Sequence, residues 1–92
     1  MIRTLLERIA IMYYIYILQS QKSNRYYIGY TSNIANRLEA HSRGSSRSTK
    51  LGRPWKLIYS EEFNNKKASM KREKEIKSYK GGIAFKNLIS KR

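Results

Sequence analysis

Four side-chain types that can take part in catalysis stand at helix-like and strand-like spacings in this sequence. Arg37 and His41 are four residues apart in a segment with helical character, so they lie on one stripe. Glu73 lies on a second predicted helix, beside its apolar stripe, and two neighbouring predicted strands each carry tyrosines. Cutting a phosphodiester bond needs a group that positions or deprotonates water, a cation against the developing charge and a carboxylate for a divalent metal. These residue types match those needs.

The charge balance favours a polyanionic partner. Lys and Arg number 20 against 6 acids, all Glu, which gives a formal net charge of +14 on 92 residues. The basic residues are spread from Arg3 to Arg92, and 40% of the chain is apolar, with eight Tyr and one Trp. A folded domain is therefore expected rather than a disordered basic tail, and nucleic acid is its simplest partner.

Several classes of site are excluded by composition. The chain has no Cys, one His and no Asp. Disulfides, Cys-ligated metals, two-His metal sites and a Ser-His-Asp triad are therefore excluded. The longest apolar run, residues 9–18, is too short to span a bilayer, so we expect a soluble cytoplasmic protein, associated with the nucleoid if its DNA is chromosomal.

The elements that must position these side chains begin with a hairpin. Residues 13–18 and 26–31 are aromatic and β-branched, and the polar stretch 19–25 between them indicates a turn. Gly29 inside the second strand predicts a bulge or a close backbone approach by a ligand. Residues 1–12 have the pattern of a short amphipathic helix. Met12 is an equally good natural start, so residues 1–11 are treated as an extension of a domain covering 12–92.

Two further predicted helices carry the polar candidates. Ser32 and Asn33 are good caps for a helix over 34–43, on which Arg37 and His41 fall at the rim of the buried face. Asn64 and Asn65 cap a helix from about residue 66 to 80, which the two glycines at 81–82 end, and a last short helix covers 83–90.

The segment between them predicts a basic loop and a third strand. Residues 44–53 read as a flexible loop, and the phosphate-backbone donors expected in and beside it are Arg43, Arg47, Lys50 and Arg53. No base-reading pattern accompanies them, so recognition of shape is favoured over sequence. Residues 55–60 alternate Trp55, Leu57 and Tyr59 against Lys56, Ile58 and Ser60. The fold class is α+β, with a small three-stranded antiparallel sheet flanked by helices.

Five short motifs in this order resemble the GIY-YIG nuclease family, specifically its small stand-alone group, UPF0213 or YhbQ-like, related to the catalytic subunit of the structure-specific endonuclease. The first motif is Tyr14-Ile15-Tyr16, with Tyr where the family name has Gly, and the second is Tyr27-Ile28-Gly29. The other three motifs lie in residues 36–41, 53–59 and 72–77. Some members place Lys where this chain has Tyr30, and many place an Asn after the Glu-bearing helix, a role that Asn87 is not positioned to claim.

The resemblance implies a function and a role for each matching residue. Tyr16 and Tyr27 would be paired active-site tyrosines, Arg37 the phosphate-stabilising cation and His41 an auxiliary donor or proton carrier. Glu73 would hold a single Mg²⁺ or Mn²⁺, an ion that keeps several waters and needs few protein ligands. The implied activity is metal-dependent DNA endonuclease chemistry, at branched or damaged structures, with a protein partner for targeting.

Plainer interpretations stay open. A strand Tyr is usually a packing residue, a lone His at a helix rim is usually hydrogen-bonded or at the surface, and Glu73 has Lys77 as an i, i+4 partner. Glu61, Glu62 and Glu75 are expected at the surface. The main alternative is a non-catalytic nucleic-acid-binding module with the same fold. A weaker one is a basic accessory protein that binds another protein.

Overall fold

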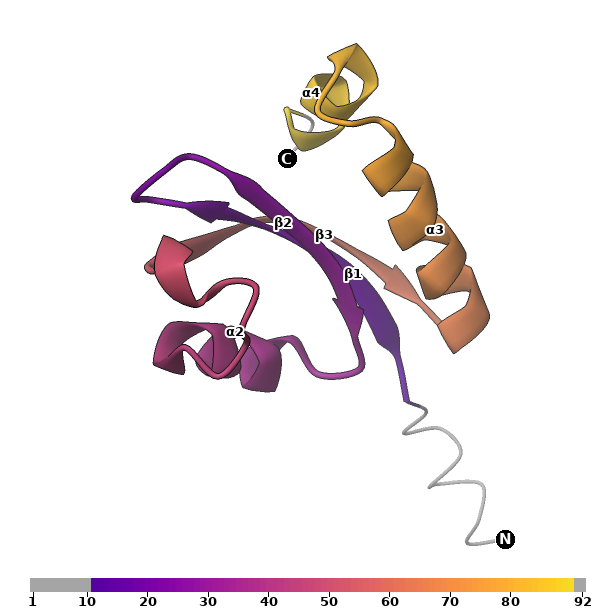
Figure 1. Ribbon diagram of the computed structural model, residues 1–92. Coiled ribbons are helices and arrows are strands. Elements are labelled where there is room, and N and C mark those ends of the chain that lie inside the picture. The colour runs from indigo at the N-terminus through magenta and orange to yellow at the C-terminus, as the bar shows by residue number, and fades with distance from the viewer. Residues whose placement is uncertain (1–10, 91–92) are drawn as a thin grey trace, which may run out of the picture.

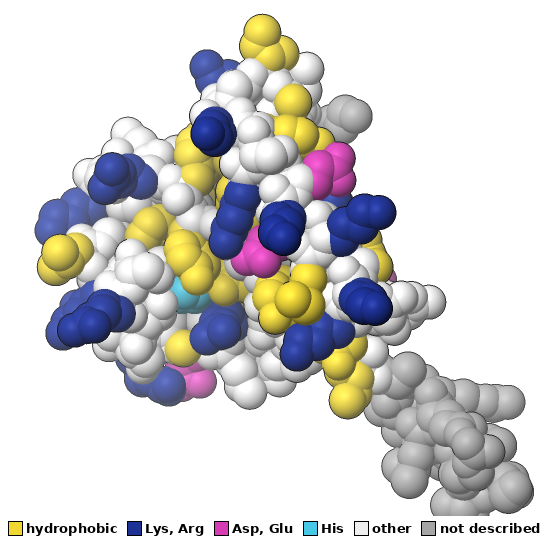
Figure 2. Space-filling view, turned by 45° about the vertical axis from the view of Figure 1, so that its right-hand side comes forward, with side chains coloured by type: hydrophobic (Ala, Val, Ile, Leu, Met, Phe, Trp, Pro, Cys, Tyr) yellow, Lys and Arg dark blue, Asp and Glu magenta, His cyan; other side chains and the backbone are white. Residues whose placement is uncertain are grey.

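Residues 11–90 are described by the computed structural model, in which one sheet separates two sets of helices (Figure 1). The strands are β1 (Tyr13–Ser20), β2 (Tyr26–Thr31) and β3 (Trp55–Phe63), and the helices are α2 (Ile34–Arg43), α3 (Lys66–Ser78) and α4 (Ile83–Ile89), with a 3-10 turn η1 (Lys50–Gly52). The predicted α+β class and antiparallel sheet are confirmed. Basic side chains are spread over the whole face seen in Figure 2. The helix predicted over residues 1–12 and the extension proposed for 1–11 fall almost wholly outside the described residues.

The sheet has the order β2-β1-β3, and both pairings are antiparallel, so β1 lies in the centre. In β1, Tyr16 faces Gly29 of β2 and Ser60 of β3. Because side chains alternate along a strand, Tyr16 points to one face of the sheet while its neighbours Ile15 and Ile17 point to the other. This alternation divides the molecule into two chemically different halves.

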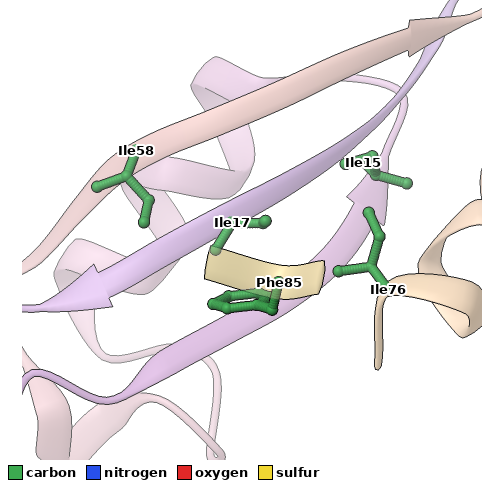
Figure 3. Packing of buried hydrophobic residues seen from close by; sticks show 5 residues of the cluster. All are labelled: Ile15, Ile17, Ile58, Ile76 and Phe85. Carbon is green, nitrogen blue, oxygen red and sulfur yellow. The ribbon is translucent and has the colours of Figure 1, made fainter. Parts of the chain in front are cut away.

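One half is an apolar core between the sheet and α3 and α4. Ile15 and Ile17 of β1 and Ile76 of α3 are fully buried, and Phe85 of α4 is 2% exposed. Figure 3 shows these side chains converging with Ile58 from β3. Burying an aliphatic side chain of this size stabilises the fold by roughly 1.5–3 kcal/mol, so this cluster supplies much of what holds the helices to the sheet.

The strand β3 departs from the predicted alternation. Ile17 pairs with Tyr59 and Leu18 with Leu57, so Ile58 is the extra residue of a bulge, and it is buried in the core. The strand also runs to Phe63 rather than ending at Ser60. A bulge lets two consecutive residues serve the core, which a strict two-residue period does not anticipate.

The predicted helices are confirmed with small differences at their ends. Asn33 accepts a hydrogen bond from the backbone N–H of Asn36, and Asn65 accepts one from that of Ala68, so both act as N-caps. The helix α3 ends at Ser78, two residues before the predicted end. Within residues 11–90, none of the helices has the length and apolar character needed to cross a membrane.

Candidate active site

The half of the molecule opposite the apolar core holds a buried chain of polar side chains. The Tyr16 hydroxyl lies 3.1 Å from Nε2 of His41, and Nδ1 of His41 lies 2.6 Å from Oγ1 of Thr49. All three residues are at most 2% exposed. Because Thr49 directs its hydroxyl hydrogen at the Ser46 carbonyl, we assign its oxygen as the acceptor from Nδ1–H. Nε2 then accepts from the Tyr16 O–H, which makes neutral His41 the proton acceptor of the pair.

His41 is brought to Thr49 by the way α2 ends. Gly44 adopts a left-handed φ of 77°, and Gly44 and Ser45 donate backbone hydrogen bonds to His41 and Ala40. This cap turns the chain back beneath the helix. Thr49, eight residues after His41, therefore returns to the same imidazole. The Trp55 indole Nε1–H donates to the Thr49 carbonyl at 2.7 Å and fixes the returning segment.

The second-motif tyrosine completes an aromatic cluster around His41. The ring centroid of Tyr27 lies 5.1 Å from the ring centroid of His41, 6.2 Å from that of Tyr16 and 6.5 Å from that of Trp55. Gly29, directly across from Tyr16, leaves room for this arrangement, since a Cβ there would lie 2.7 Å from the Tyr16 hydroxyl oxygen. The pairing of β1 with β2 is regular at Gly29, so the bulge predicted there is wrong, and the side chain that approaches the Gly29 backbone closely is Tyr16.

The electrostatics place two more candidates beside this cluster. Burial raises the pKa of Tyr16, and the neighbouring Tyr27 and the negative charge of Glu73 add to the rise, while the positive charge of Arg37 opposes it. The pKa of His41 is lowered by burial and by the same Arg37. Tyr16 is thus held protonated and His41 neutral. Both Arg37 and Glu73 lie close enough to Tyr16 to influence its proton.

Glu73 is a partly buried carboxylate with one basic partner. Its side chain is 18% exposed, and its Oε2 lies 3.1 Å from Nζ of Lys77, so the i, i+4 pair considered from the sequence forms. Among residues 11–90 no cluster of three or more His, Cys, Asp or Glu side chains is arranged to hold a metal. One carboxylate with waters and substrate oxygens fits Mg²⁺, which keeps much of its hydration shell, and does not fit an ion that needs an all-protein cage.

The four predicted phosphate contacts lie in or next to the 44–53 segment, which carries Thr49 of the buried chain. Arg43 forms an exposed i, i+4 pair with Glu39. The Arg53 guanidinium donates to the Lys50 carbonyl and packs against Gly44, and Arg47 is exposed. All four side chains are solvent-accessible, as a phosphate-binding role requires.

Expectations about two residues and one segment are corrected. His41 is 1% exposed, so its predicted rim position is wrong, whereas Arg37 is exposed. The segment 44–53 is not simply a flexible loop, since it contains η1 and the fully buried Thr49. Glu61 is not a free surface group, because Arg72 grips it with two hydrogen bonds of 2.9 and 2.8 Å and Tyr59 donates to it. That contact lowers the pKa of Glu61.

Thr49 is the residue of this site that sequence reasoning missed. It stands in a run of Ser, Arg, Thr and Lys whose composition is typical of a solvated loop. Its hydroxyl reaches the imidazole of His41 only because the chain turns back toward α2. The Trp that follows Pro54 was the available signal, since a Trp needs packing and a partner for its N–H, and both come from this segment.

Comparison with known proteins assigns the family. Residues 12–83 match the model of the GIY-YIG catalytic domain. The chain is 41% identical to the UPF0213 protein of Staphylococcus haemolyticus over 73% of its length and 82% of that protein's, and 37% identical to one of Pediococcus pentosaceus over 83% and 90%. The solution NMR structure of the UPF0213 protein of Bacillus halodurans is 29% identical and covers 80% of this chain and 90% of its own, with a TM-score of 0.45.

The match to the catalytic-domain model spans both tyrosine motifs, the α2 helix, β3 and the α3 helix that carries Glu73. The relatives match over most of their own lengths as well as over most of this chain. The chain therefore belongs to the GIY-YIG family and, within it, to the small UPF0213 proteins.

Proposed function

We propose that the protein is a metal-dependent endonuclease that hydrolyses phosphodiester bonds in DNA. The observation that carries the proposal is the buried Tyr16–His41–Thr49 chain, beside Tyr27 and within electrostatic reach of Arg37 and Glu73. A packing tyrosine does not need a fully buried histidine aligned to accept its proton. Proton transfer during hydrolysis requires an aligned donor and acceptor, and this pair lies within electrostatic reach of the exposed Arg37.

In the proposed reaction the protein moves a proton and offsets charge. Attack of water on the phosphorus forms a new P–O bond while the P–O bond to the leaving oxygen breaks. The proton of the attacking water passes to the Tyr16 oxygen, the Tyr16 proton passes to Nε2 of His41, and the leaving alkoxide takes a proton from solvent water. Thr49 holds the imidazole in the tautomer that can accept it, and the guanidinium of Arg37 offsets the charge that develops on the phosphate oxygens. Tyr27, which is only partly buried, is the tyrosine that the substrate meets first.

Glu73 is the proposed ligand for a single Mg²⁺ or Mn²⁺. When bound, the ion would polarise a phosphate oxygen and lower the pKa of a coordinated water. Without a bound ion, Lys77 compensates the negative charge of Glu73. The basic residues of the 44–53 segment and Arg43 would hold the flanking phosphates. Contacts to phosphates carry no sequence information, so the proposed substrates are DNA structures, such as branched or damaged ones, rather than a particular base sequence.

The proposal is tested with labelled branched DNA, Mg²⁺ and three proteins: wild type, Glu73→Gln and Glu75→Gln. Glu75 is a matched control two residues further along α3, where it is exposed and paired with Arg72 and Tyr79. We expect Glu73→Gln to lower the cleavage rate by at least about 100-fold, the range for loss of a group that stabilises the transition state. Glu75→Gln is expected to stay within about twofold of wild type.

Equal cutting by wild type and Glu73→Gln would remove Glu73 as the metal ligand. Salt-dependent binding by the wild type with no Mg²⁺-dependent or Mn²⁺-dependent cutting of branched, flapped or damaged DNA would contradict the enzyme proposal. That result would favour the alternative of a non-catalytic nucleic-acid-binding module on the same fold.

A further inference from the structure

A groove leads away from the candidate active site between the β1–β2 turn and the 44–53 segment. Its volume is about 660 Å³. Aromatic and aliphatic side chains line it together with basic ones, including Tyr27, Trp55, Leu51, Lys22 and Arg25. Tyr27 belongs both to this groove and to the cluster around His41, so the two sites are continuous.

The groove is a built feature and not a gap between mobile loops. Ser20 is fully buried, and its hydroxyl donates to the Gly52 carbonyl at 2.6 Å while accepting from the backbone N–H groups of Lys22 and Ser23. Gln21 also donates to the Pro54 carbonyl at 2.9 Å. These bonds tie the two walls together at their base. The indole of Trp55 is held by Thr49, as described above.

The most unusual feature of the groove is Leu51. It is 84% exposed, although a leucine gains stability from burial, and it sits between Lys50 and Arg53 on a turn fixed by hydrogen bonds. An apolar side chain held on a basic surface can pack against the face of an exposed nucleobase, while the neighbouring cations contact phosphates. Among the described residues, none of the side chains lining the groove is acidic, so a polyanion is the complementary occupant.

We propose that this groove binds an unpaired nucleotide next to the bond that is cut, with the base between Leu51 and the aromatic rings and its phosphates at Lys22 and Arg25. The inference deepens the proposed function, because it names the form of the substrate beside the active site. A base inside a duplex is stacked on its neighbours and cannot present its face to a side chain, whereas an unpaired base can stack on aromatic residues regardless of its sequence.

The test measures binding in the absence of divalent metal, so that cleavage plays no part. The probes are a short oligothymidylate, its ribonucleotide counterpart, an abasic oligomer of equal length and charge, and a duplex. Binding is followed through the fluorescence of Trp55, the sole tryptophan in the chain, and independently by anisotropy of labelled probes. We expect the wild type to bind the oligothymidylate about tenfold more tightly than the abasic oligomer, with quenching of Trp55.

Leu51→Ala is the informative variant, because an exposed side chain can be shortened without disturbing the core. We expect it to lose most of the preference for bases over abasic sites while binding the duplex within about twofold of wild type. Ile83→Ala is the matched control. Ile83 is 79% exposed on α4 and does not line the groove, and its removal should change neither affinity.

Equal wild-type affinity for the oligothymidylate and the abasic oligomer would overturn the inference, as would an equal loss in Leu51→Ala and Ile83→Ala. Tighter binding of the deoxy or the ribo oligomer than of the abasic oligomer supports the inference, and the tighter of the two shows which sugar is preferred. The two proposals fail separately. A protein that prefers unpaired bases but cuts no DNA supports the groove and contradicts the enzyme, and a protein that cuts without this preference does the reverse.

Discussion

The two faces of β1 show how differently neighbouring residues of one strand can be stabilised. Ile17 is fully buried against α3 and α4, and any apolar side chain of similar shape could fill this position. Tyr16, one residue earlier, is also buried, but its hydroxyl faces Nε2 of His41, which in turn depends on Thr49. The apolar face is held by contacts without direction, whereas Tyr16 and His41 on the other face also depend on hydrogen bonds in which each donor needs its acceptor.

The difference teaches which face is free to change. On the apolar face, stability falls with each buried atom removed, and no hydrogen-bond partner is lost. On the polar face, small changes that keep volume can leave a buried nitrogen or oxygen without a partner. The variants below separate these two kinds of dependence.

The largest loss of stability is expected on the apolar face. Ile17→Ala should lower the free energy of unfolding by about 2–5 kcal/mol, because it removes buried methylene and methyl groups and leaves a cavity. The measurement is urea unfolding followed by circular dichroism. In the fraction that stays folded, binding of nucleic acid should be unchanged, and a selective loss of binding would show that the two faces are coupled.

Among the variants of β1 and of the hydrogen-bonded chain, Tyr16→Phe should have the largest effect on function. The ring and its packing remain, but Nε2 of His41 loses its donor, at a cost of about 1–3 kcal/mol in stability. Cleavage should fall by about 100-fold or more, because the proton carrier is gone. The cleavage rate and the free energy of unfolding are measured on the same protein. If the rate falls only in proportion to the fraction of protein that is folded, Tyr16 is a packing residue.

Thr49→Val tests whether the third residue acts through His41. The substitution keeps the shape but removes the acceptor for Nδ1–H, so we expect about 1 kcal/mol of destabilisation and about a tenfold slower cleavage. Thr49→Ser, which restores a hydroxyl, should recover most of the rate. If Thr49→Val shifts neither the rate nor the pH profile, Thr49 is only a structural residue of the loop.

The pH dependence of stability should reflect His41 in a modest way. Because its pKa is lowered from 6.5 in the folded protein, the unfolded chain binds more protons as the pH falls below 6.5. Stability is therefore fully retained above this value and declines as the pH falls toward the folded pKa of His41. Cleavage should follow the same direction, since protonated His41 cannot accept from Tyr16. Substituting His41→Gln should remove this part of the decline and leave the more acidic part due to Glu61.

Much of the fold could be predicted because it depends on local patterns. The β-branched and aromatic runs, the Asn caps and the Gly81-Gly82 stop mark the strands and helices within a few residues. The bulge at Ile58 could not be predicted, since it depends on which residue of β3 the helices α3 and α4 leave room to bury. Likewise, Glu61 and Glu62 are neighbours of the same type, and only the position of Arg72 on α3 distinguishes them.

The sequence by itself determined the residue types available for chemistry: a single histidine, six glutamates and a large positive charge. With its motifs, it also singled out Tyr16, Tyr27, Arg37, His41 and Glu73. Only the tertiary structure decided that His41 is buried between Tyr16 and Thr49, and that Leu51 stands exposed above a groove ending at Tyr27. The physical reason is that burial and hydrogen bonding between distant segments depend on how the chain turns at Gly44, and no local pattern records which side chains meet after that turn.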